Sequence, residues 1–406
     1  MDKKIKIGII REGKVPPDKR VPLTPEQCSR LNKQLSGMEV VVQPSVKRCF
    51  PDAEYEQMGI QLREDLSDCD VLMGIKEVPV KELIPGKTYF YFSHTIKKQP
   101  HNRKLLQKMI ALGITMVDYE TLTNTSGERL IAFGRYAGIV GAYNAFRAYG
   151  EKFGVYHLKP AHECFDRKEM ESELKKVILP ADFKIVITGS GRVGGGCLEI
   201  LKGMNLQQVT SEDYLSKSFS QPVFTVLHVG DYNKAKDGSV FDKKSFYGNP
   251  SAFEPDFLKW ARCSDMYIPC HFWDSKAPMI LRKEDYTDPQ FRIRVIADVS
   301  CDISIPIAST IRSSTIADPF YGYDPQTGEE ADFYAPNTIG VMAVDNLPCE
   351  LPRDASRDFG EVLLEKILPL LSGPDPDKII ERATMCSKGD LLPKYEYLRA
   401  YLEGKE

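Results

Sequence analysis

Three glycines at positions 189, 191 and 194 give the clearest chemical signal in the sequence. They follow the apolar run Ile185–Ile187, which predicts a buried strand, and they precede a helix-forming run, Cys197–Met204. The spacing is G-x-G-x-x-G, which lets backbone N–H groups and a helix N-terminus approach a pyrophosphate closely. An ordinary strand–turn–helix corner can share this spacing, but the strands expected further along the chain favour dinucleotide binding. The predicted cradle consists of Gly189, Ser190, Gly191, Arg192, Val193 and Gly194.

Charged side chains follow four successive apolar runs in the first part of the chain. Redox chemistry at a dinucleotide needs cations that hold substrate carboxylates and a group that moves protons. Each charge alone is typical of a solvated loop, whereas four strand ends that all carry such groups indicate a site. The candidates are Arg11, Lys14 and Arg20, then Lys76 and Glu77, then His94 and Lys97, and finally Glu120.

The elements that would position these side chains alternate between strands and helices. Thr24 is expected to cap a helix that starts at Pro25, with Gln27 completing a capping box. One further helix is expected at Asn102–Leu112. The expected strands are Lys4–Ile10, Met38–Val42, Val71–Ile75, Tyr89–Phe92 and Ile114–Asp118. This alternation predicts a parallel α/β domain.

The second half of the chain continues the same alternation. Leu130–Phe153 is rich in small residues and predicts a tightly packed helix between two domains, while Asp231–Pro255 is a polar and aromatic insertion with little periodicity. Arg357–Leu371 is apolar at helical spacing and is expected to return to the first domain. The expected strands are Val223–Val229, Met266–Pro269 and Arg294–Val299.

We therefore predict an α/β protein of two Rossmann-like lobes with parallel sheets. The substrate lobe would comprise residues 1–136 and 354–406, and the dinucleotide-binding lobe, residues 137–353, would be inserted into it. The substrate would meet the cofactor in a cleft between the lobes.

The composition excludes several classes of protein. A chain of 406 residues suggests about two domains, and a net charge of -3 gives no reason to expect nucleic acid as a partner. No apolar run reaches the ~18 residues that a membrane span needs, and Arg11 and Glu12 interrupt the first run before a signal-peptide core. Ten cysteines without a C-x-x-C pair indicate free thiols, no metal site and a cytoplasmic location. The cluster His162–Cys164 has no second ligand group at metal spacing. The oligomeric state stays open.

Several motifs resemble a known family. KRVPLTPEQ, GIKEVP, YFSHTIK and VDNLPCELPRDAS resemble the alanine dehydrogenase and pyridine nucleotide transhydrogenase superfamily. VDYETLTNTSGERLIAFGRYAG, IADVSCDIS and LLPKYEYLRAYL are similar to lysine-forming saccharopine dehydrogenases, and most of all to the lysine–2-oxoglutarate reductase half of a bifunctional enzyme. The resemblance implies a nicotinamide enzyme that reversibly condenses L-lysine and 2-oxoglutarate to saccharopine. It implies no activity of the bifunctional enzyme's second half in this chain.

The resemblance also implies roles for individual residues. Lys76 and His94 match the acid–base pair of the family, and Arg20 and Arg129 match arginines that hold oxo-acid carboxylates. Other charged groups expected around the substrate are Arg11, Lys14, Asp18, Glu77, Lys97, Glu120 and Asp345. Asn346–Pro348 resembles a loop beside the nicotinamide, so Asn346, Leu347 and, on the IADVS motif, Asp298 are expected at the cofactor.

The choice between NAD and NADP depends on the strand that follows the glycine-rich helix. NAD selectivity usually needs an acid at the tip of the second strand, where it binds the ribose 2′-OH. Thr210 and Ser211 occupy the expected tip, Glu212 follows, and Lys217 could offset a 2′-phosphate charge. Together with the resemblance to the reductase half, this favours NADP, with NAD as the alternative.

Three other functions are compatible with the sequence. An alanine-type dehydrogenase would share Arg20, Lys76 and His94 but would leave the insertion and Glu120 unexplained. A related opine-type enzyme would take an amine donor other than lysine. A non-catalytic nucleotide sensor would need neither Lys76 nor His94.

Overall fold

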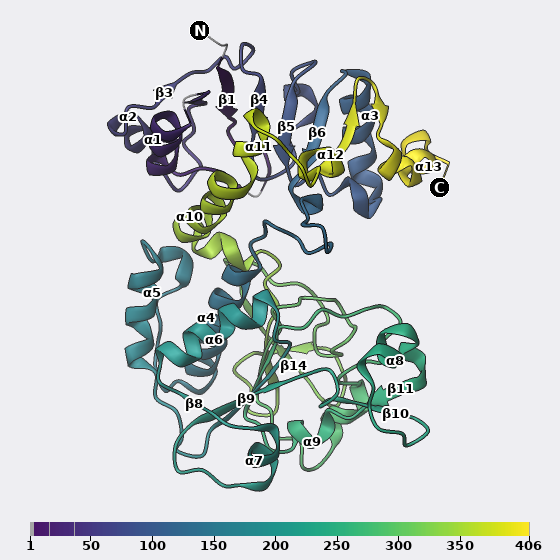
Figure 1. The fold of residues 1–406 in the computed structure, drawn as a ribbon. Helices are drawn as coiled ribbons and strands as arrows, with labels where there is room; N and C mark the ends of the chain where they lie inside the picture. The colour runs from purple at the N-terminus through teal and green to yellow at the C-terminus, as the bar shows by residue number, and fades with distance from the viewer. Residues whose placement is uncertain (1–3, 16, 36, 406) are drawn as a thin grey trace. The chain divides into compact units, whose positions relative to one another are not determined.

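The computed structural model describes residues 4–15, 17–35 and 37–405. The chain divides into two compact units, each with its own hydrophobic core. Unit 1 comprises Met1–Phe133 and Pro352–Glu406, and unit 2 comprises Gly134–Leu351 (Figure 1). Unit 2 is thus inserted into unit 1 along the chain. The expected α/β class with two mostly parallel sheets is confirmed.

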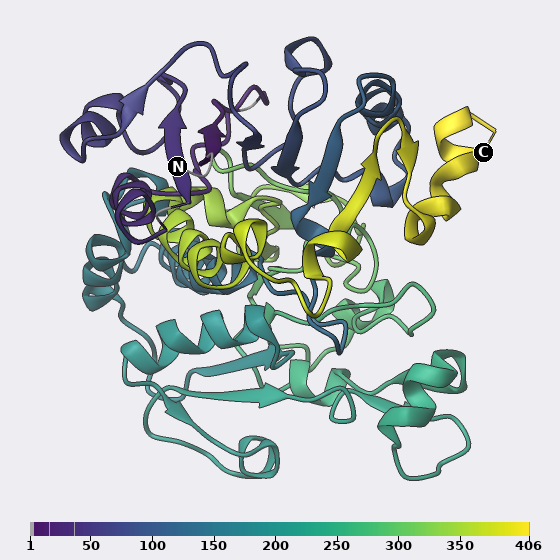
Figure 2. The same ribbon diagram turned by 45° about the horizontal axis from the view of Figure 1, so that its top comes forward.

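Unit 1 is built on an eight-stranded sheet with the order β18-β17-β6-β5-β4-β1-β2-β3. The six strands from β6 to β3 are parallel, and two antiparallel strands of the C-terminal tail extend the edge beside β6 (Figure 2). The bounds are β1 Ile5–Ile9, β2 Met38–Val42, β3 Gln61–Leu62, β4 Val71–Met73, β5 Thr88–Tyr91, β6 Thr115–Asp118, β17 Thr384–Ser387 and β18 Asp390–Leu391.

The helices of unit 1 include one whose start the sequence predicts correctly. The Thr24 hydroxyl accepts a hydrogen bond from Gln27 N, and the Gln27 side chain accepts one from Thr24 N, so the capping box is formed. The bounds are α1 Pro25–Gln34, α2 Asp52–Gln57, α3 Arg103–Ala111, α10 Pro352–Val362, α11 Pro369–Ser372, α12 Ile379–Ala383 and α13 Arg399–Glu403.

The tail departs from the single helical run expected at Arg357–Leu371. Helix α10 starts earlier, at Pro352, and passes into a π-helical turn, Leu363–Ile367, before the short α11. Pro369 has no N–H to donate within a helix, which explains the break. The hairpin β17–β18, which the sequence analysis missed, turns at Lys388 and Gly389, both with positive φ.

Unit 2 is built on a second eight-stranded sheet with the order β15-β14-β16-β13-β12-β7-β9-β8. The strands from β16 to β8 are parallel, and β14 and β15 form an antiparallel edge. The bounds are β7 Lys184–Thr188, β8 Gln207–Gln208, β9 Val223–Leu227, β12 Met266–Pro269, β13 Val295–Ala297, β14 Phe320–Tyr323, β15 Glu330–Ala331 and β16 Ile339–Met342.

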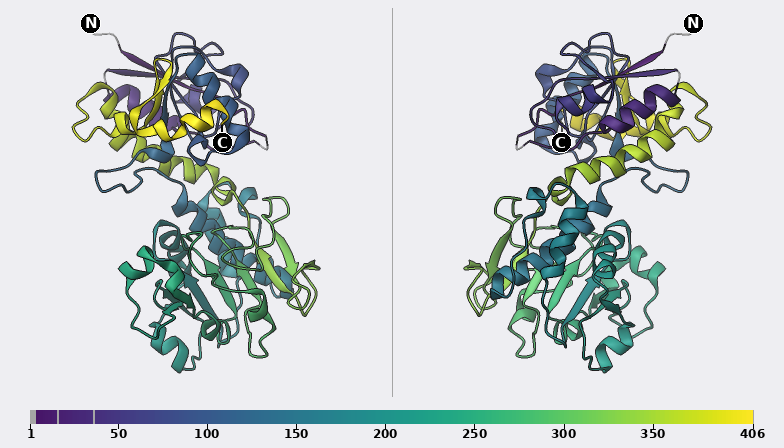
Figure 3. Two further views of the ribbon diagram at one scale, coloured as in Figure 1. Left: turned by 90° about the vertical axis from the view of Figure 1, so that its right-hand side faces the viewer. Right: turned by 90° about the vertical axis from the view of Figure 1, so that its left-hand side faces the viewer.

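Two long helices of unit 2 pack closely together. Helix α4, Gly134–Phe153, starts four residues after the expected Leu130, and α6, Arg192–Gly203, starts five residues before the expected Cys197. A Cβ atom at Gly138 would lie 1.9 Å from the Val193 carbonyl oxygen, so only glycine permits this approach. Helix α4 also lies against the sheet (Figure 3). The shorter helices are α5 Arg167–Glu173, α7 Ser211–Ser216 and α9 Leu258–Ala261.

The insertion at Asp231–Pro255 has more regular structure than its sequence indicates. It forms a small antiparallel pair, β10 Asn233–Ala235 with β11 Phe253–Pro255, and helix α8 Lys243–Gly248 lies between the two strands in the chain. These elements gather at one side of unit 2 (Figure 1).

The strand order corrects one expectation. The strand that follows the glycine-rich helix, β8, is the outermost strand of its sheet, and β9 is the neighbour of β7. Thr210 and Ser211, expected at the tip of the strand that binds the ribose, therefore follow the edge strand, and β9 occupies the place beside β7.

Candidate functional site

Charged residues of unit 1 meet at the carboxyl ends of four adjacent strands, β1, β4, β5 and β6. Lys14 Nζ donates to Glu77 Oε1 at 3.0 Å, and His94 Nδ1 lies 3.6 Å from Glu120 Oε2, just beyond hydrogen-bond distance. Glu77 Oε2 is buried without a hydrogen-bond partner. The structure thus brings together candidates that the sequence spreads over more than one hundred positions.

Glu120 is the centre of the charges around His94. Arg129 donates to its Oε1 at 3.1 Å, and Lys97 Nζ lies 3.9 Å from the same oxygen. Burial raises the pKa of Glu120, but the contacts with His94, Lys97 and Arg129 outweigh burial and lower it to about 2. Glu120 is therefore a carboxylate at neutral pH and can orient a cationic group.

Lys76 has the electrostatics of a group that exchanges protons. Its side chain is partly buried in the loop after β4. Burial, together with the neighbouring charges of Arg20 and Lys14, lowers its pKa below the ordinary lysine value. A lysine with a lowered pKa supplies a neutral amine more readily near neutral pH, as proton transfer requires.

Arg20 is held firmly inside unit 1. Its guanidinium forms a bidentate ion pair with Asp18, both side chains are at most 3% exposed, and the Phe133 ring centroid lies 4.1 Å away. Since Asp18 already binds this guanidinium, the role of Arg20 as a ligand for substrate carboxylates stays a prediction.

Two buried carboxyl groups that the sequence analysis did not identify as site residues fix the backbone beside the candidates. Glu12 accepts hydrogen bonds from Ile75 N at 2.5 Å and Lys76 N at 3.0 Å. Asp118 accepts from Ser93 N at 3.1 Å and from Glu120 N at 2.7 Å. Their signal in the sequence is an acid at or just beyond an apolar run, where a solvated charge is the ordinary interpretation.

The backbone of His94 is also constrained. His94 has φ of 54°, in the left-handed region that few non-glycine residues adopt, and its ring stacks on Phe92 at an interplanar angle of 17°. Such a conformation persists only where the surroundings impose it. Asp118 supplies part of that constraint through Ser93.

Two further predicted substrate residues have other surroundings within their own units. Arg11 is exposed and forms an ion pair with Glu64, beyond β3. Asp345 is an exposed residue of unit 2.

The glycine-rich turn of unit 2 opens onto a cavity of about 730 Å³. Gly189 has φ of 93°, and a Cβ there would lie 2.7 Å from the Cys270 carbonyl oxygen; at Gly191 a Cβ would meet nothing within 4 Å. The turn is therefore packed closely against the residues after β12 at Gly189 and is open at Gly191, which fits close approach by a pyrophosphate. The lining includes the predicted Gly189, Ser190, Gly191, Arg192 and Val193.

Gly194 and five other predicted cofactor residues do not line this cavity. A Cβ at Gly194 would lie 2.1 Å from the Gly189 carbonyl oxygen, so Gly194 shapes the turn from behind. Asp298 is buried and accepts hydrogen bonds from Ser300 N and Thr310 Oγ1, which positions the loop after β13. Also outside the lining are Ser211, Glu212, Asn346 and Leu347.

The cavity has further lining residues that the sequence analysis missed. His271, after β12, has a pKa lowered to about 4 by burial, its Nδ1 lies 2.7 Å from Thr188 Oγ1, and its Nε2 is buried without a partner. The others include His228 and Tyr232 after β9, Lys243 and Tyr247 of α8, and Ser300 and Asp302 after β13.

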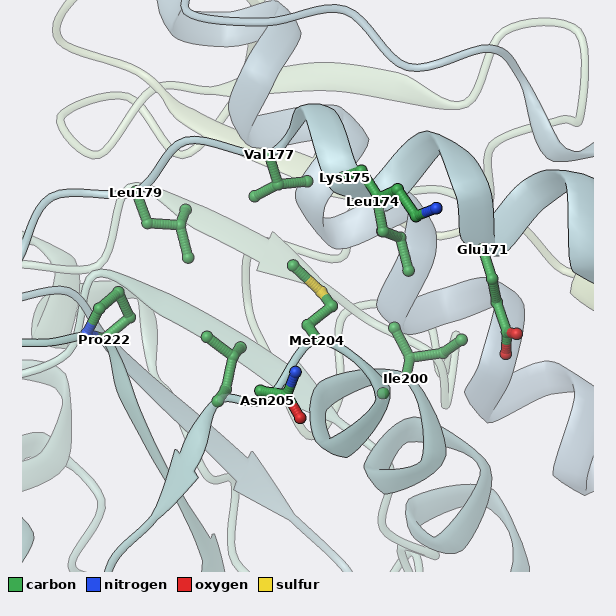
Figure 4. Close-up of a pocket in the computed structure, with 11 residues that line it drawn as sticks. Glu171, Leu174, Lys175, Val177, Leu179, Ile200, Met204, Asn205 and Pro222 are labelled. Atoms are coloured by element: carbon green, nitrogen blue, oxygen red, sulfur yellow. The ribbon is translucent and has the colours of Figure 1, made fainter.

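A second cavity of unit 2, of about 490 Å³, lies at the opposite ends of the strands. Its lining comes from segments that precede β7, β8 and β9, together with the end of α6, and apolar side chains such as Val177, Leu179 and Met204 dominate it (Figure 4). Ligands of open α/β sheets bind outside the carboxyl ends of the strands, so this cavity is not a candidate cofactor site.

The described ranges contain neither a membrane-spanning helix nor a cluster of metal ligands. Among residues 4–15, 17–35 and 37–405, no helix is long and apolar enough to cross a membrane. Within the same ranges no group of three or more His, Cys, Asp or Glu side chains could hold a metal ion, and His162 Nδ1 lies 3.9 Å from the buried Glu350.

Comparisons with known proteins agree with this architecture. Residues 8–140 match the family described as alanine dehydrogenase/PNT, N-terminal domain. The alpha-aminoadipic semialdehyde synthase of Arabidopsis thaliana is 30% identical over 97% of this chain and 41% of its own length. A saccharopine dehydrogenase (NAD(+), L-lysine-forming) of Neurospora crassa is 26% identical over 86% of this chain and 87% of its own length. The chain therefore spans less than half of the plant relative but most of the fungal one.

A solved structure shares the fold. An L-alanine dehydrogenase superposes with a TM-score of 0.66 over 98% of this chain and 99% of its own, at 16% sequence identity. The resemblance inferred from the motifs is confirmed by these relatives.

Proposed function

We propose that this protein is a nicotinamide-dependent oxidoreductase that reversibly joins L-lysine and 2-oxoglutarate into saccharopine. The proposal is supported by the match of residues 8–140 to the alanine dehydrogenase/PNT N-terminal domain family and by the similarity of the chain to lysine-forming saccharopine dehydrogenases. The observation that carries the proposal is that a bound carboxylate–cation pair lies beside each candidate proton-transfer group. Lys76 is followed by Glu77, which binds Lys14, and His94 faces Glu120, which binds Arg129. Such a surface suits a substrate pair that carries both ammonium and carboxylate groups.

The proposed roles combine this arrangement with the resemblance of the individual residues to those of the family. Lys76, with its lowered pKa, takes a proton from the substrate amine so that its nitrogen can attack the oxo carbon. His94 donates a proton to the carbinolamine oxygen, so that water leaves and an imine remains. Glu120 and Glu77 hold cationic groups of the amine, and Arg129 and Arg20 bind oxo-acid carboxylates.

The dinucleotide would lie against Gly189, Ser190 and Gly191 of unit 2. Its chemistry, when bound, is hydride transfer to or from the carbon attached to nitrogen. One of the two sequence-based reasons for NADP, the residues after β8, no longer holds, because Ser211 and Glu212 lie outside the cavity and Lys217 is paired with Asp213. The resemblance to the reductase half still favours NADP, with NAD as the alternative. A cytoplasmic location also stays a proposal, supported by ten free cysteines.

A panel of amine and oxo-acid pairs, followed by nicotinamide absorbance, tests the proposed function. We expect turnover with lysine plus 2-oxoglutarate and much less with ornithine or with another oxo acid. Equal or faster turnover with ammonia plus pyruvate would favour the alanine-type alternative. Dinucleotide binding without turnover of any pair would favour a nucleotide sensor.

A further inference from the structure

The strand order of unit 2 shows where the adenosine ribose of a dinucleotide would lie. Strand β9 pairs with β7 along its whole length, from Val223 beside Lys184 to Leu227 beside Thr188. Gly189 N also donates to Leu227 O at 3.2 Å. The residues after Leu227 therefore lie next to the glycine-rich turn, in the place where dinucleotide folds bind the ribose 2′ position.

Strand β8 does not reach this place. It pairs only with the beginning of β9, Gln208 lying beside Phe224. Ser211 and Glu212 then turn into α7, and neither lines the cavity.

Basic side chains from two segments that follow β9 in the chain line the cavity. His228 follows β9 directly, is exposed, and its Nδ1 lies 3.5 Å from Ser190 Oγ of the turn. Lys243 reaches the same cavity from α8, in the inserted segment between β10 and β11. The neighbouring Lys244 does not line it.

Acidic side chains of these segments have other partners. Asp231 Oδ2 accepts a hydrogen bond from His228 N at 2.7 Å, and Asp242 Oδ2 accepts one from Ser245 N at 2.6 Å. Glu254 lies 3.3 Å from Lys234 Nζ. Among the described residues that line the cavity, the one carboxylate is Asp302, which follows β13 on the other side of β7.

We propose that His228 and Lys243 form a binding site for the 2′-phosphate of NADP(H), and that the insertion at Asp231–Pro255 supplies this specificity by carrying Lys243 to the cavity. The inference rests on the proposed function in that it assigns the cavity to a nicotinamide dinucleotide. A 2′-phosphate carries nearly two negative charges and three acceptor oxygens, which two basic side chains bind well. A bare ribose hydroxyl gains little from them, and the one carboxylate of the lining, Asp302, follows a strand on the other side of β7.

Nucleotide binding to the full chain, measured by calorimetry without amino acid or oxo acid, tests this site. We expect the unchanged protein to bind NADPH at least about tenfold more tightly than NADH. Lys243→Ala and His228→Ala should each weaken NADPH binding by about tenfold, the effect of losing one charge-assisted hydrogen bond, and leave NADH binding unchanged. Lys243→Arg should keep the preference.

Two control variants match these changes. Lys244→Ala removes the adjacent charge on the same helix, and Glu212→Gln changes the position that the sequence alone suggests; neither should alter the NADPH to NADH ratio. The proposal is overturned if NADH binds as tightly as NADPH, if Lys243→Ala weakens both nucleotides equally, or if Glu212→Gln changes the ratio.

These outcomes are independent of the proposed reaction. A protein that shows the expected binding pattern but does not turn over lysine and 2-oxoglutarate keeps this site and loses the proposed function. A protein that turns over this pair with NADH and binds NADPH no better keeps the function and loses the site.

Discussion

At the scale of single residues, buried carboxyl groups hold the loops that carry the candidate proton-transfer side chains. Glu12 binds the backbone of the Lys76 loop, and Asp118 binds that of the loops before His94 and Glu120. Each carboxyl group replaces water as the acceptor for two N–H groups that would otherwise be buried without a partner. The side chains that we propose to face the substrate are thus positioned by residues with no expected contact to it.

Lys76→Met and His94→Gln test the proposed acid–base roles. Each variant should lower kcat by about 10²-fold or more, the usual effect of removing a positioned proton-transfer group. The dissociation constant for the dinucleotide should change little, because the glycine-rich cavity lies wholly in unit 2. Turnover near the unchanged rate in both variants would contradict the assignment.

Glu12→Gln tests the electrostatic state of the buried carboxyl group. Burial, with a smaller contribution from Asp18, raises the pKa of Glu12 to about 8. Between the unfolded value of about 4.3 and 8, the folded chain holds a proton that the unfolded chain has lost, so this group makes the fold less stable as pH rises through that window. The Glu12→Gln variant has no titratable group at this position and therefore lacks this contribution.

Thermal unfolding at pH 5 and pH 8 measures the effect. Between pH 5 and pH 8, the Tm of the unchanged protein should fall by more than the Tm of Glu12→Gln. At pH 5 the variant should be the less stable of the two, because an amide NH₂ then faces a backbone N–H. Glu56→Gln, at an exposed position of α2, is the control and should leave the pH dependence unchanged. An unaltered pH dependence in Glu12→Gln would show that Glu12 is ionised in the fold.

At the scale of elements, close packing of α4 against α6 explains why a run of glycines forms a helix. Intrinsic propensity disfavours Gly194–Gly196 in a helix, and for that reason the sequence places the helix start at Cys197. In the structure the helix starts at Arg192 and includes these glycines. A Cβ at Gly196 would lie 1.9 Å from the Arg135 carbonyl oxygen of α4, so the glycine is what lets the two helices pack this closely. Tertiary packing overrides the propensity.

Gly138→Ala tests this packing, with Gly195→Ala as its matched control. The Gly138 substitution places a methyl group 1.9 Å from the Val193 carbonyl oxygen, so the helices must separate at a cost of about 1–3 kcal/mol. Because Val193 also lines the cavity, dinucleotide affinity should fall as well. Gly195 has nothing within 4 Å of its Cβ position, and its replacement should raise Tm slightly. A Tm for Gly138→Ala equal to that of the unchanged protein would contradict the packing.

Local patterns predict local structure well here and spatial order poorly. The capping box of Thr24 and the strands Met38–Val42 and Met266–Pro269 follow from short-range spacing and are confirmed. The order of β8 and β9 depends on which strands pair, which no local pattern encodes. The sequence analysis also missed Lys243, because an exposed lysine in a polar insertion has no sequence signal that separates it from Lys244.

At the scale of the whole molecule, the chain combines two chemically distinct sites on two sheets. Unit 1 carries paired cations and carboxylates at the ends of β1, β4, β5 and β6, and unit 2 carries a glycine-rich turn with a basic cavity. Fold class and the alternation of elements follow from the sequence. Most neighbours that shift the pKa values of Lys76 and Glu120 lie in loops that follow other strands, so those shifts could be found only in the structure.

The most direct measurement is the mass of the product formed from isotopically labelled substrates. The purified chain is incubated with NADPH, lysine labelled with ¹⁵N at the ε-nitrogen, and 2-oxoglutarate, and the mixture is analysed by mass spectrometry. The proposed function predicts one product whose mass is the sum of lysine and 2-oxoglutarate less water plus two hydrogens, with the label retained, and none in Lys76→Met on the same timescale. Absence of this product, together with NADPH-dependent formation of a product from ammonia and pyruvate, would contradict it.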